Sequence, residues 1–222
     1  MFQKLFAQFL FPVVSALTLM LALPAHAETT EKGKILVLGD SLSSGYNFSP
    51  DRTWVALLDT KLSEENINYQ VINSSISGDT TTQGLQRLPK LLEVHQPDVV
   101  IIELGGNDGL RGFPPNTIKQ NLNKLVTLSQ QANADVLLLG IQIPPNYGQK
   151  YAQAFFNNYQ QIADVSQIAL VPFFLENVGG KDELMQDDGI HPNEKAQPIL
   201  LENVWPKVRE VLEFPVDSSV EP

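Results

Sequence analysis

Residues 34–42 read KILVLGDSL, a short apolar run that ends at Gly39 and is followed at once by Asp40 and Ser41. A continuous apolar run of this length is typical of a strand that is buried on both faces, as in a parallel sheet. We therefore predict a buried strand at residues 34–39. In open parallel sheets, ligands bind beyond the carboxyl ends of the strands, so Ser41 would lie on the binding edge.

Similar apolar runs alternate with stretches of helical periodicity along the rest of the chain. The predicted strands cover residues 34–39, 69–73, 98–104, 136–141 and 168–171, and the predicted helices cover residues 52–65, 80–95, 115–132, 149–166 and 194–212. Strands separated by helices favour a mostly parallel sheet that is covered on both faces, which makes this an α/β domain. The segments after the first four strands are predicted loops, at residues 40–45, 74–82, 105–112 and 142–148.

The composition excludes several classes of function. The chain has 222 residues, which suits one domain. Its formal net charge of −10 argues against sequence-independent nucleic-acid binding, which needs clustered lysine and arginine. The absence of cysteine excludes thiol catalysis, zinc–thiolate sites, iron–sulfur clusters and disulfides. The sequence also lacks a Walker loop, a dinucleotide-binding glycine fingerprint and the G-x-S-x-G motif of α/β-hydrolases.

The first 27 residues have the features of a signal peptide that is cleaved on export. Lys4 precedes an apolar run at residues 5–23, and the sequence AHA at residues 25–27 forms an A-x-A cleavage site. An uncleaved membrane anchor is the alternative, because the apolar run approaches the length of a membrane span. We predict cleavage, with a periplasmic or secreted domain at residues 28–213 and a flexible tail at residues 214–222. Cleavage would remove one of the 15 bases and none of the 25 acids, so the mature charge would be −11.

Three histidines are candidates for the general base that hydrolysis at neutral pH requires. His26 leaves with the predicted signal peptide, and His95 ends a predicted helix, where a basic residue is common for capping alone. His191 follows Asp188 by three residues, so the carboxylate can accept a hydrogen bond from the imidazole and fix its tautomer. The alternative is an aspartate-rich turn that opens the last helix. A metal site is a weaker interpretation, because no second histidine remains to join His191.

Ser41 is the candidate nucleophile, because it directly follows the first predicted strand. The alternative is an ordinary turn in which Asp40 and Ser41 cap a helix. Acyl transfer also needs hydrogen-bond donors for the developing oxyanion. Asn107 follows the third predicted strand and Gly78 the second, so a side-chain amide and an unobstructed backbone N–H could reach the same edge. Each loop alone is an ordinary turn sequence, and their convergence at the strand ends is what indicates a hydrolytic site.

These segments resemble, in their usual order, the four sequence blocks of the SGNH (GDSL) hydrolases. The matching segments are GDSLS at residues 39–43, Gly78, GGND at residues 105–108 and DGIH at residues 188–191. Longer stretches, among them ELGGNDGLRG at residues 103–112, are similar to exported bacterial members that hydrolyse esters, acyl thioesters and lysophospholipids. The similarity spans nearly all of residues 34–212.

The resemblance implies a flavodoxin-like three-layer α/β sandwich, the SGNH hydrolase fold, and hydrolysis of carboxylic esters and thioesters through an acyl-serine intermediate. By this resemblance Ser41 is the nucleophile, His191 the base and Asp188 its orienter. The backbone N–H groups of Ser41 and Gly78, with the amide of Asn107, would form the oxyanion hole. No cofactor and no metal are implied.

A small-molecule acyl ester or a lysophospholipid is the expected substrate. Apolar side chains in the loops after the third and fourth strands suit an acyl chain better than a sugar. The candidate substrate-binding residues are Asp40, Gly106, Pro144 and Tyr147. We expect a monomer with no nucleic-acid partner and no stable membrane insertion after cleavage. Two alternatives stay open, namely a carbohydrate O-deacetylase of the same family and a catalytically inactive periplasmic lipid-binding module.

Overall fold

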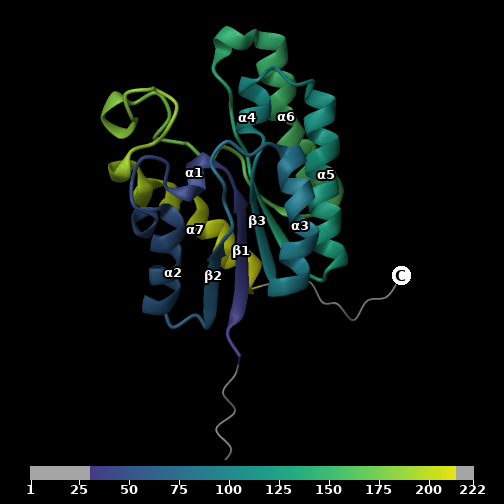
Figure 1. Cartoon of the computed structure of the whole chain (residues 1–222), viewed down its shortest axis with the longest axis vertical. Coiled ribbons are helices and arrows are strands. Elements are labelled where there is room, and N and C mark those ends of the chain that lie inside the picture. Colours follow the sequence, from purple (N-terminus) through teal and green to yellow (C-terminus); the bar gives the residue numbers. More distant parts are fainter. Residues whose placement is uncertain (1–30, 214–222) are drawn as a thin grey trace, which may run out of the picture. The chain divides into compact units, whose positions relative to one another are not determined.

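A parallel sheet forms the centre of residues 31–213, the part of the chain that the computed structural model describes (Figure 1). Its strands are β1 (Gly33–Gly39), β2 (Tyr69–Asn73), β3 (Val99–Glu103), β4 (Asp135–Leu139) and β5 (Ala169–Val171). Their spatial order is β2-β1-β3-β4-β5, and every neighbouring pair is parallel. The five predicted strands are confirmed, each within two residues of its predicted ends.

The strand order reverses direction between β1 and β3. The chain runs from β1 outward to β2, and then crosses back over β1 to form β3 on its other side. In open α/β sheets, this reversal splays the loops apart and leaves a crevice at the carboxyl ends of the two strands. The segments that follow β1 and β3, which carry Ser41 and Asn107, therefore flank the expected crevice.

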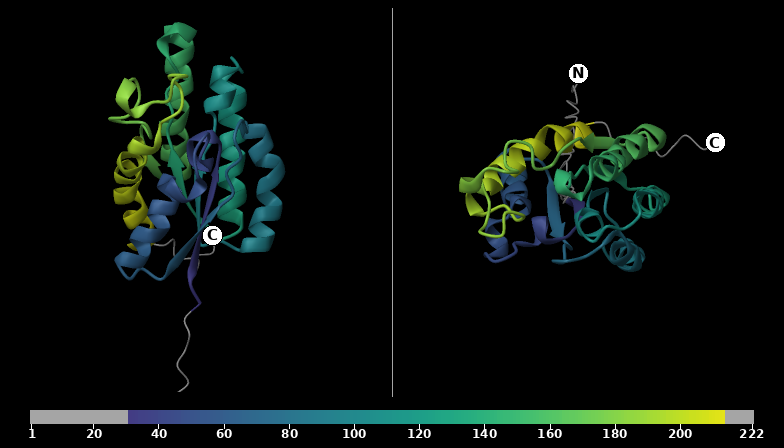
Figure 2. Two further views of the ribbon diagram at one scale, coloured as in Figure 1. Left: turned by 60° about the vertical axis from the view of Figure 1, so that its left-hand side comes forward. Right: turned by 90° about the horizontal axis from the view of Figure 1, so that it is seen from above.

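Helices cover both faces of the sheet (Figures 1 and 2). The helices on one face are α2 (Trp54–Glu64) and α7 (Gln197–Glu213), and those on the other are α3 (Thr81–His95), α5 (Pro115–Gln131) and α6 (Gln149–Ser166). Successive side chains of a strand point to opposite faces, so Leu36 and Leu38 join one core while Ile35 and Val37 join the other. Because both faces of β1 are buried in a core, its residues 35–38 are all apolar and do not alternate between apolar and polar side chains. The predicted three-layer α/β sandwich is confirmed.

Two short helices lie in segments that were predicted to be loops, after β1 and β3. They are α1 (Ser41–Ser44) and α4 (Gly106–Leu110). The Asp40 side chain caps α1 by accepting a hydrogen bond from the backbone N–H of Leu42. Helices of four or five residues are too short to show an apolar period, so the sequence pattern could not reveal them. They place the candidate nucleophile and the candidate amide donor in the first turns of helices.

Short 3-10 turns account for the other differences from the predicted elements. They are η1 (Pro50–Arg52), η2 (Pro145–Tyr147), η3 (Asp182–Leu184) and η4 (Glu194–Ala196). The helix predicted from residue 52 begins at Trp54, because the Thr53 hydroxyl accepts a hydrogen bond from the backbone N–H of Ala56 and sets the cap there. The helix predicted from residue 194 begins at Gln197, after η4.

The predicted signal peptide at residues 1–27 and the predicted tail at residues 214–222 lie outside the described residues. Residues 32–213 belong to one compact unit, which falls within the predicted domain at residues 28–213. No helix in the described part of the chain is long and apolar enough to span a bilayer.

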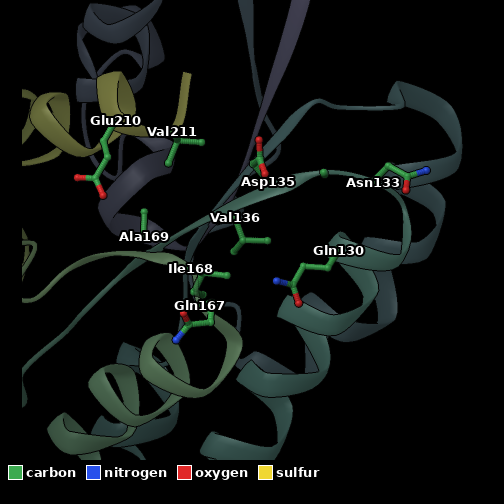
Figure 3. Close-up of a pocket in the computed structure, with 10 residues that line it drawn as sticks. Gln130, Asn133, Asp135, Val136, Gln167, Ile168, Ala169, Glu210 and Val211 are labelled. Atoms are coloured by element: carbon green, nitrogen blue, oxygen red, sulfur yellow. The ribbon is translucent and has the colours of Figure 1, made fainter. Parts of the chain in front are cut away.

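A pocket of about 300 Å³ opens at the amino ends of β4 and β5 (Figure 3). Its lining residues are Gln130, Asn133, Ala134, Asp135, Val136, Gln167, Ile168, Ala169, Glu210 and Val211. The strands are parallel, so this edge of the sheet is opposite to the edge that carries Ser41. The lining set includes carboxylates and amides but no hydroxyl or imidazole, and it therefore offers no nucleophile with an adjacent base.

Candidate active site

Ser41, His191 and Asp188 form a continuous chain of hydrogen bonds at the carboxyl edge of the sheet. Ser41 Oγ lies 2.9 Å from His191 Nε2, and His191 Nδ1 lies 2.7 Å from Asp188 Oδ2. Ser41 is the first residue of α1, while Asp188 and His191 lie between η3 and η4, some 150 residues further along the chain. The structure thus brings together the three residues that the sequence predicted as a triad.

The Asp188 carboxylate is fixed by backbone hydrogen bonds in a position that orients the imidazole. Its Oδ1 accepts hydrogen bonds from the backbone N–H groups of Ile190 and His191, both at 2.9 Å, which leaves Oδ2 for the imidazole. Burial alone would raise the pKa of Asp188, but the hydrogen bonds from His191 and Ile190 outweigh it and lower the pKa. An ionised Asp188 accepts a hydrogen bond from the Nδ1–H group of His191, so Nε2 carries the lone pair that can accept a proton from Ser41.

The other two histidines do not contribute to this cluster. His95 is the last residue of α3, immediately before the chain enters β3, and so it lies at the amino edge of the sheet. This placement agrees with the expectation that His95 has a helix-end role. His26 lies outside the described residues.

Asp40, predicted to bind substrate, is buried next to Ser41. It is 1% exposed, and its two oxygens accept hydrogen bonds from the backbone N–H of Leu42 at 3.1 Å and from the side chain of Asn107 at 2.9 Å. Burial raises the pKa of Asp40 to about 6, against the effect of these hydrogen bonds and of the nearby His191. The carboxyl group therefore joins α1 to α4 through these two hydrogen bonds, and its contact with a substrate stays a prediction.

Two backbone N–H groups near the nucleophile are free to stabilise an oxyanion. Among residues 31–213, no acceptor takes a hydrogen bond from the backbone N–H of Ser41 or of Gly78. Gly78 has a φ of +84°, in the left-handed region that favours glycine, and a side chain at this position would meet nothing within 4 Å. Both groups have the character that an oxyanion hole requires, namely donors that are not already bonded.

The loop that carries Gly78 is held in place by two arginines. Arg87 donates from Nε and Nη2 to Asp79 Oδ2, at 2.9 and 2.6 Å, and from Nη1 to the carbonyl oxygen of Ser74 at 2.8 Å. Arg111 donates to the carbonyl oxygen of Gly78 at 3.1 Å. Charge-assisted hydrogen bonds of this kind join the loop to α3 and to the end of α4, while the backbone N–H of Ile76 donates to the carbonyl oxygen of Gly39 at the end of β1.

Asn107 is close to the nucleophile, but its amide is already bonded. Its Nδ2 donates to Asp40 Oδ2 at 2.9 Å and to the carbonyl oxygen of Asp79 at 3.0 Å. An amide nitrogen has two hydrogens, so both are engaged in this structure. Donation to an oxyanion would require Asn107 to release or share one of these bonds. The carbonyl of Asp79 is the weaker acceptor of the two whenever Asp40 is ionised.

The predicted substrate-binding residues other than Asp40 lie at the same edge of the sheet. Gly106 opens α4, where a Cβ would lie 3.6 Å from Asp40 Oδ2. Pro144 and Tyr147 are exposed in the segment after β4, and the carbonyl of Pro144 accepts a hydrogen bond from the backbone N–H of Tyr147. Their contact with a substrate stays a prediction.

Glu103 is a buried acid that the sequence analysis did not single out as part of the site. It ends β3 and is 0% exposed, and its Oε2 accepts hydrogen bonds from the Ser43 hydroxyl at 2.8 Å and from the backbone N–H of Asp40 at 3.2 Å. Its Oε1 has no hydrogen-bond partner in the described part of the chain. Burial and then the charge of Asp40 raise the pKa of Glu103 well above its usual range. A glutamate inside the otherwise apolar run at residues 98–104 was the available signal.

Glu103→Gln should make the protein more stable at neutral and alkaline pH. The folded-state pKa of Glu103 is raised, so the wild-type free energy of unfolding falls as pH rises above the unfolded value near 4.5, by up to about 1.4 kcal/mol per pH unit. Glutamine mimics the neutral acid and removes this dependence. Urea unfolding at pH 4 to 8 should show a Glu103→Gln advantage that grows with pH, whereas exposed Glu93→Gln should show none. An equal difference at pH 4 and pH 8 would mean that Glu103 is ionised in the folded protein.

The described residues contain no group of three or more histidine, cysteine, aspartate or glutamate side chains that could hold a metal ion. Ser41, His191 and Asp188 supply a hydroxyl, an imidazole and a carboxylate in one chain of hydrogen bonds. The arrangement is therefore suited to acyl transfer by a hydroxyl nucleophile, in which the protein itself supplies the proton acceptor.

The known proteins that this chain resembles in sequence and structure are esterases, thioesterases and other acylhydrolases. Residues 37–198 match the GDSL-like Lipase/Acylhydrolase family. The chain is 49% identical over 189 residues to an arylesterase of Vibrio mimicus, covering 85% of this chain and 94% of that protein. It is 50% identical over 166 residues to thioesterase 1/protease 1/lysophospholipase L1 of Escherichia coli K12, covering 75% and 78%. The crystal structure of a psychrotrophic esterase, EstA from Pseudoalteromonas sp., inhibited by monoethylphosphonate, superposes with a TM-score of 0.79 at 43% identity, covering 82% of this chain and all of that one.

Proposed function

The chain belongs to the GDSL-like lipase/acylhydrolase family and is an ester hydrolase, and on this premise we propose that Ser41, His191 and Asp188 are its catalytic triad. The observation that supports the proposal is the hydrogen-bond chain from Ser41 Oγ through both ring nitrogens of His191 to Asp188, at 2.9 and 2.7 Å. A nucleophile bonded to a base, with the base oriented by a third group, is the geometry that activates a serine hydroxyl.

In the acylation step, His191 Nε2 accepts the hydroxyl proton as Ser41 Oγ forms a bond to the substrate carbonyl carbon. The carbonyl oxygen becomes an oxyanion, which the free N–H groups of Ser41 and Gly78 bind, together with the amide of Asn107. When the carbon–oxygen or carbon–sulfur bond breaks, the His191 proton passes to the leaving group. Water then attacks the acyl-serine with His191 as base, and the carboxylic acid leaves with Ser41 restored.

Reaction with a phosphonate ester tests the nucleophile directly. A phosphonate that forms a stable adduct with an activated serine should label the protein once, abolish ester hydrolysis, and leave its mass on the peptide that contains Ser41. Ser41→Ala should not be labelled. An unlabelled but folded wild-type protein would instead support the inactive lipid-binding alternative. The Pseudoalteromonas esterase was crystallised with such an inhibitor, monoethylphosphonate.

We propose acyl esters, acyl thioesters and lysophospholipids as the substrate class. Large apolar side chains are exposed in the segments that follow the strands at the carboxyl edge, namely Ile76, Phe113, Tyr147 and Ile190. Apolar surface beside a hydrolytic site suits an acyl chain, whereas a sugar would need more polar partners. The curated relatives are named arylesterase and thioesterase/lysophospholipase, which agrees with this class.

The value of kcat/KM should rise from acetyl towards medium or long acyl chains, because each added methylene can be buried against this apolar surface. A series of p-nitrophenyl esters from acetyl to palmitoyl, measured below the concentration at which each ester aggregates, would show the trend. A steep preference for acetyl would favour the carbohydrate O-deacetylase instead.

We propose further that the protein is exported after cleavage following residue 27 and acts as a monomer. The A-x-A sequence at residues 25–27 supports cleavage, and the three triad residues come from a single chain. The N-terminal sequence of the protein recovered from the periplasm or medium, with its mass in solution, would test both points.

A further inference from the structure

The aromatic ring of Tyr46 lies against the imidazole ring of His191. The two ring centroids are 4.3 Å apart, with an angle of 33° between the ring planes. Tyr46 follows Gly45, which ends α1 in the left-handed conformation with a φ of +84°. Asp188 and Ser41 bind the two ring nitrogens of His191, so these contacts occupy the edge of the imidazole while Tyr46 lies over its face.

The Gln186 side chain joins the segment that carries Tyr46 to the segment that carries His191. Its Nε2 donates to the carbonyl oxygen of Tyr46 at 3.0 Å and to that of Pro192 at 3.1 Å, and its Oε1 accepts a hydrogen bond from the Asn47 side chain at 3.1 Å. The backbone N–H of Gln186 also donates to the carbonyl oxygen of His191 at 2.7 Å. Gln186 thus joins the segment after α1, which lies 140 residues before it in the chain, to the segment that carries His191.

We propose that Tyr46 is a positioning residue for His191, and that Gln186 keeps the Tyr46 ring against the imidazole by joining their two segments. The proposal rests on the assignment of His191 as the base. It gives a role to two side chains that take no part in the triad or the oxyanion hole.

The physical basis is the charge that His191 gains during the reaction. When it accepts the proton of Ser41 it becomes an imidazolium, and the face of an aromatic ring attracts a cation held against it. The other charged groups that act on His191 are Asp188, through its hydrogen bond, and the buried carboxyl of Asp40. Tyr46 adds a stabilising contact over the face of the ring, whereas Asp188 acts at its edge through Nδ1. It also restricts the imidazole to the rotamer that reaches both Ser41 and Asp188.

The matched variants for the ring are Tyr46→Phe, which keeps an aromatic face, and Tyr46→Leu, which keeps apolar bulk without one. The predicted mature chain has only two histidines, His95 and His191, so the ring-proton NMR signals of His95 serve as an internal reference. In Tyr46→Leu the ring-proton chemical shifts of His191 should change, because the aromatic ring over its face is lost, while those of His95 should stay unchanged. Tyr46→Phe should keep shifts close to those of the wild type.

The kinetic result should follow the same pattern. Tyr46→Leu should lower kcat several-fold more than it changes KM, because the contact matters most once His191 is charged. Tyr46→Phe should keep kcat close to that of the wild type. If Tyr46→Leu left kcat unchanged, the Tyr46 ring would have no part in positioning His191 and the proposal would be wrong.

Gln186→Ala tests the tie between the two segments, with Gln153→Ala on the exposed face of α6 as its control. Gln186→Ala should lower kcat and speed backbone hydrogen exchange near residues 186–193, whereas Gln153→Ala should change neither. Unchanged exchange and kcat in Gln186→Ala would overturn the role of Gln186. Failure of the triad assignment would look different, because Ser41 would then not react with the phosphonate even in the wild type.

Discussion

Ser41→Ala is expected to leave a folded protein whose kcat is lower by several orders of magnitude. The substitution removes only the Oγ atom, which in the structure contacts His191 at the edge of the sheet and supports no buried packing. Without it no acyl-serine can form, and the remaining groups can only polarise a carbonyl and orient water. The residual rate should therefore come from the oxyanion donors and substrate binding alone.

His191→Ala should lose nearly as much activity as Ser41→Ala, and the double variant should lose little more, because the members of a triad act as a unit. His95→Ala is the matched control, since it removes the other histidine of the predicted mature chain at the opposite edge of the sheet. Rates on one p-nitrophenyl ester, with unfolding curves for each variant, would make the comparison. An inactive His95→Ala beside an active His191→Ala would contradict the assignment of the base.

The architecture could be predicted from the sequence because the inner strands β1, β3 and β4 are buried on both faces. Residues 99–102 and 35–38 contribute side chains to two separate cores, so they appear in the sequence as uninterrupted apolar runs. The short helices α1 and α4 could not be predicted in this way. They are fixed by local capping at Asp40 and by the turn at Gly105, whose φ of +114° only glycine adopts readily.

Only part of the site could be predicted from the rule that ligands bind beyond the carboxyl ends of the strands in an open parallel sheet. That rule, with the family resemblance, led to Ser41 and His191, which lie 2.9 Å apart despite their separation in the chain. It could not show that Asp40 is buried, because its neighbours Leu42 and Asn107 are set by α1 and α4. Nor could it reveal the Tyr46 contact, which depends on how the chain leaves α1.

The raised pKa values of Asp40 and Glu103 could not be predicted from the sequence either. Glu103 lies at the end of a buried strand beside Asp40, and no arginine or lysine of the described chain forms an ion pair with either. Two acids without a cation cannot both stay ionised at low cost, and burial together with their mutual repulsion accordingly raises the pKa of Glu103 well above its usual range. Asp40 accepts the hydrogen bond that joins the amide of Asn107 to the turn at Ser41.

Asn107→Ala should lower kcat by about 10²–10³-fold, or about 3–4 kcal/mol, the typical effect of one lost oxyanion donor. KM should change little, because the ground-state carbonyl carries less charge than the oxyanion and gains less from the donor. The two bonds that Asn107 makes in the structure, to Asp40 and to the carbonyl of Asp79, add a second consequence. Asn107→Ala leaves Asp40 with one donor fewer, so the pKa of Asp40 should rise and the free energy of unfolding should fall.

Those two effects can be separated by measuring kcat, KM and unfolding together. Asn121→Ala is the control, since its amide donates to the hydroxyls of Thr81 and Thr82 and its loss should reduce stability without lowering kcat. If Asn107→Ala lost stability but kept kcat, Asn107 would be a structural partner of Asp40, and the backbone N–H groups of Ser41 and Gly78 would form the oxyanion hole alone. A change confined to KM would mean that Asn107 only positions the substrate. A large loss of kcat with a small loss of stability requires one amide hydrogen to turn from the Asp79 carbonyl to the oxyanion as Ser41 attacks.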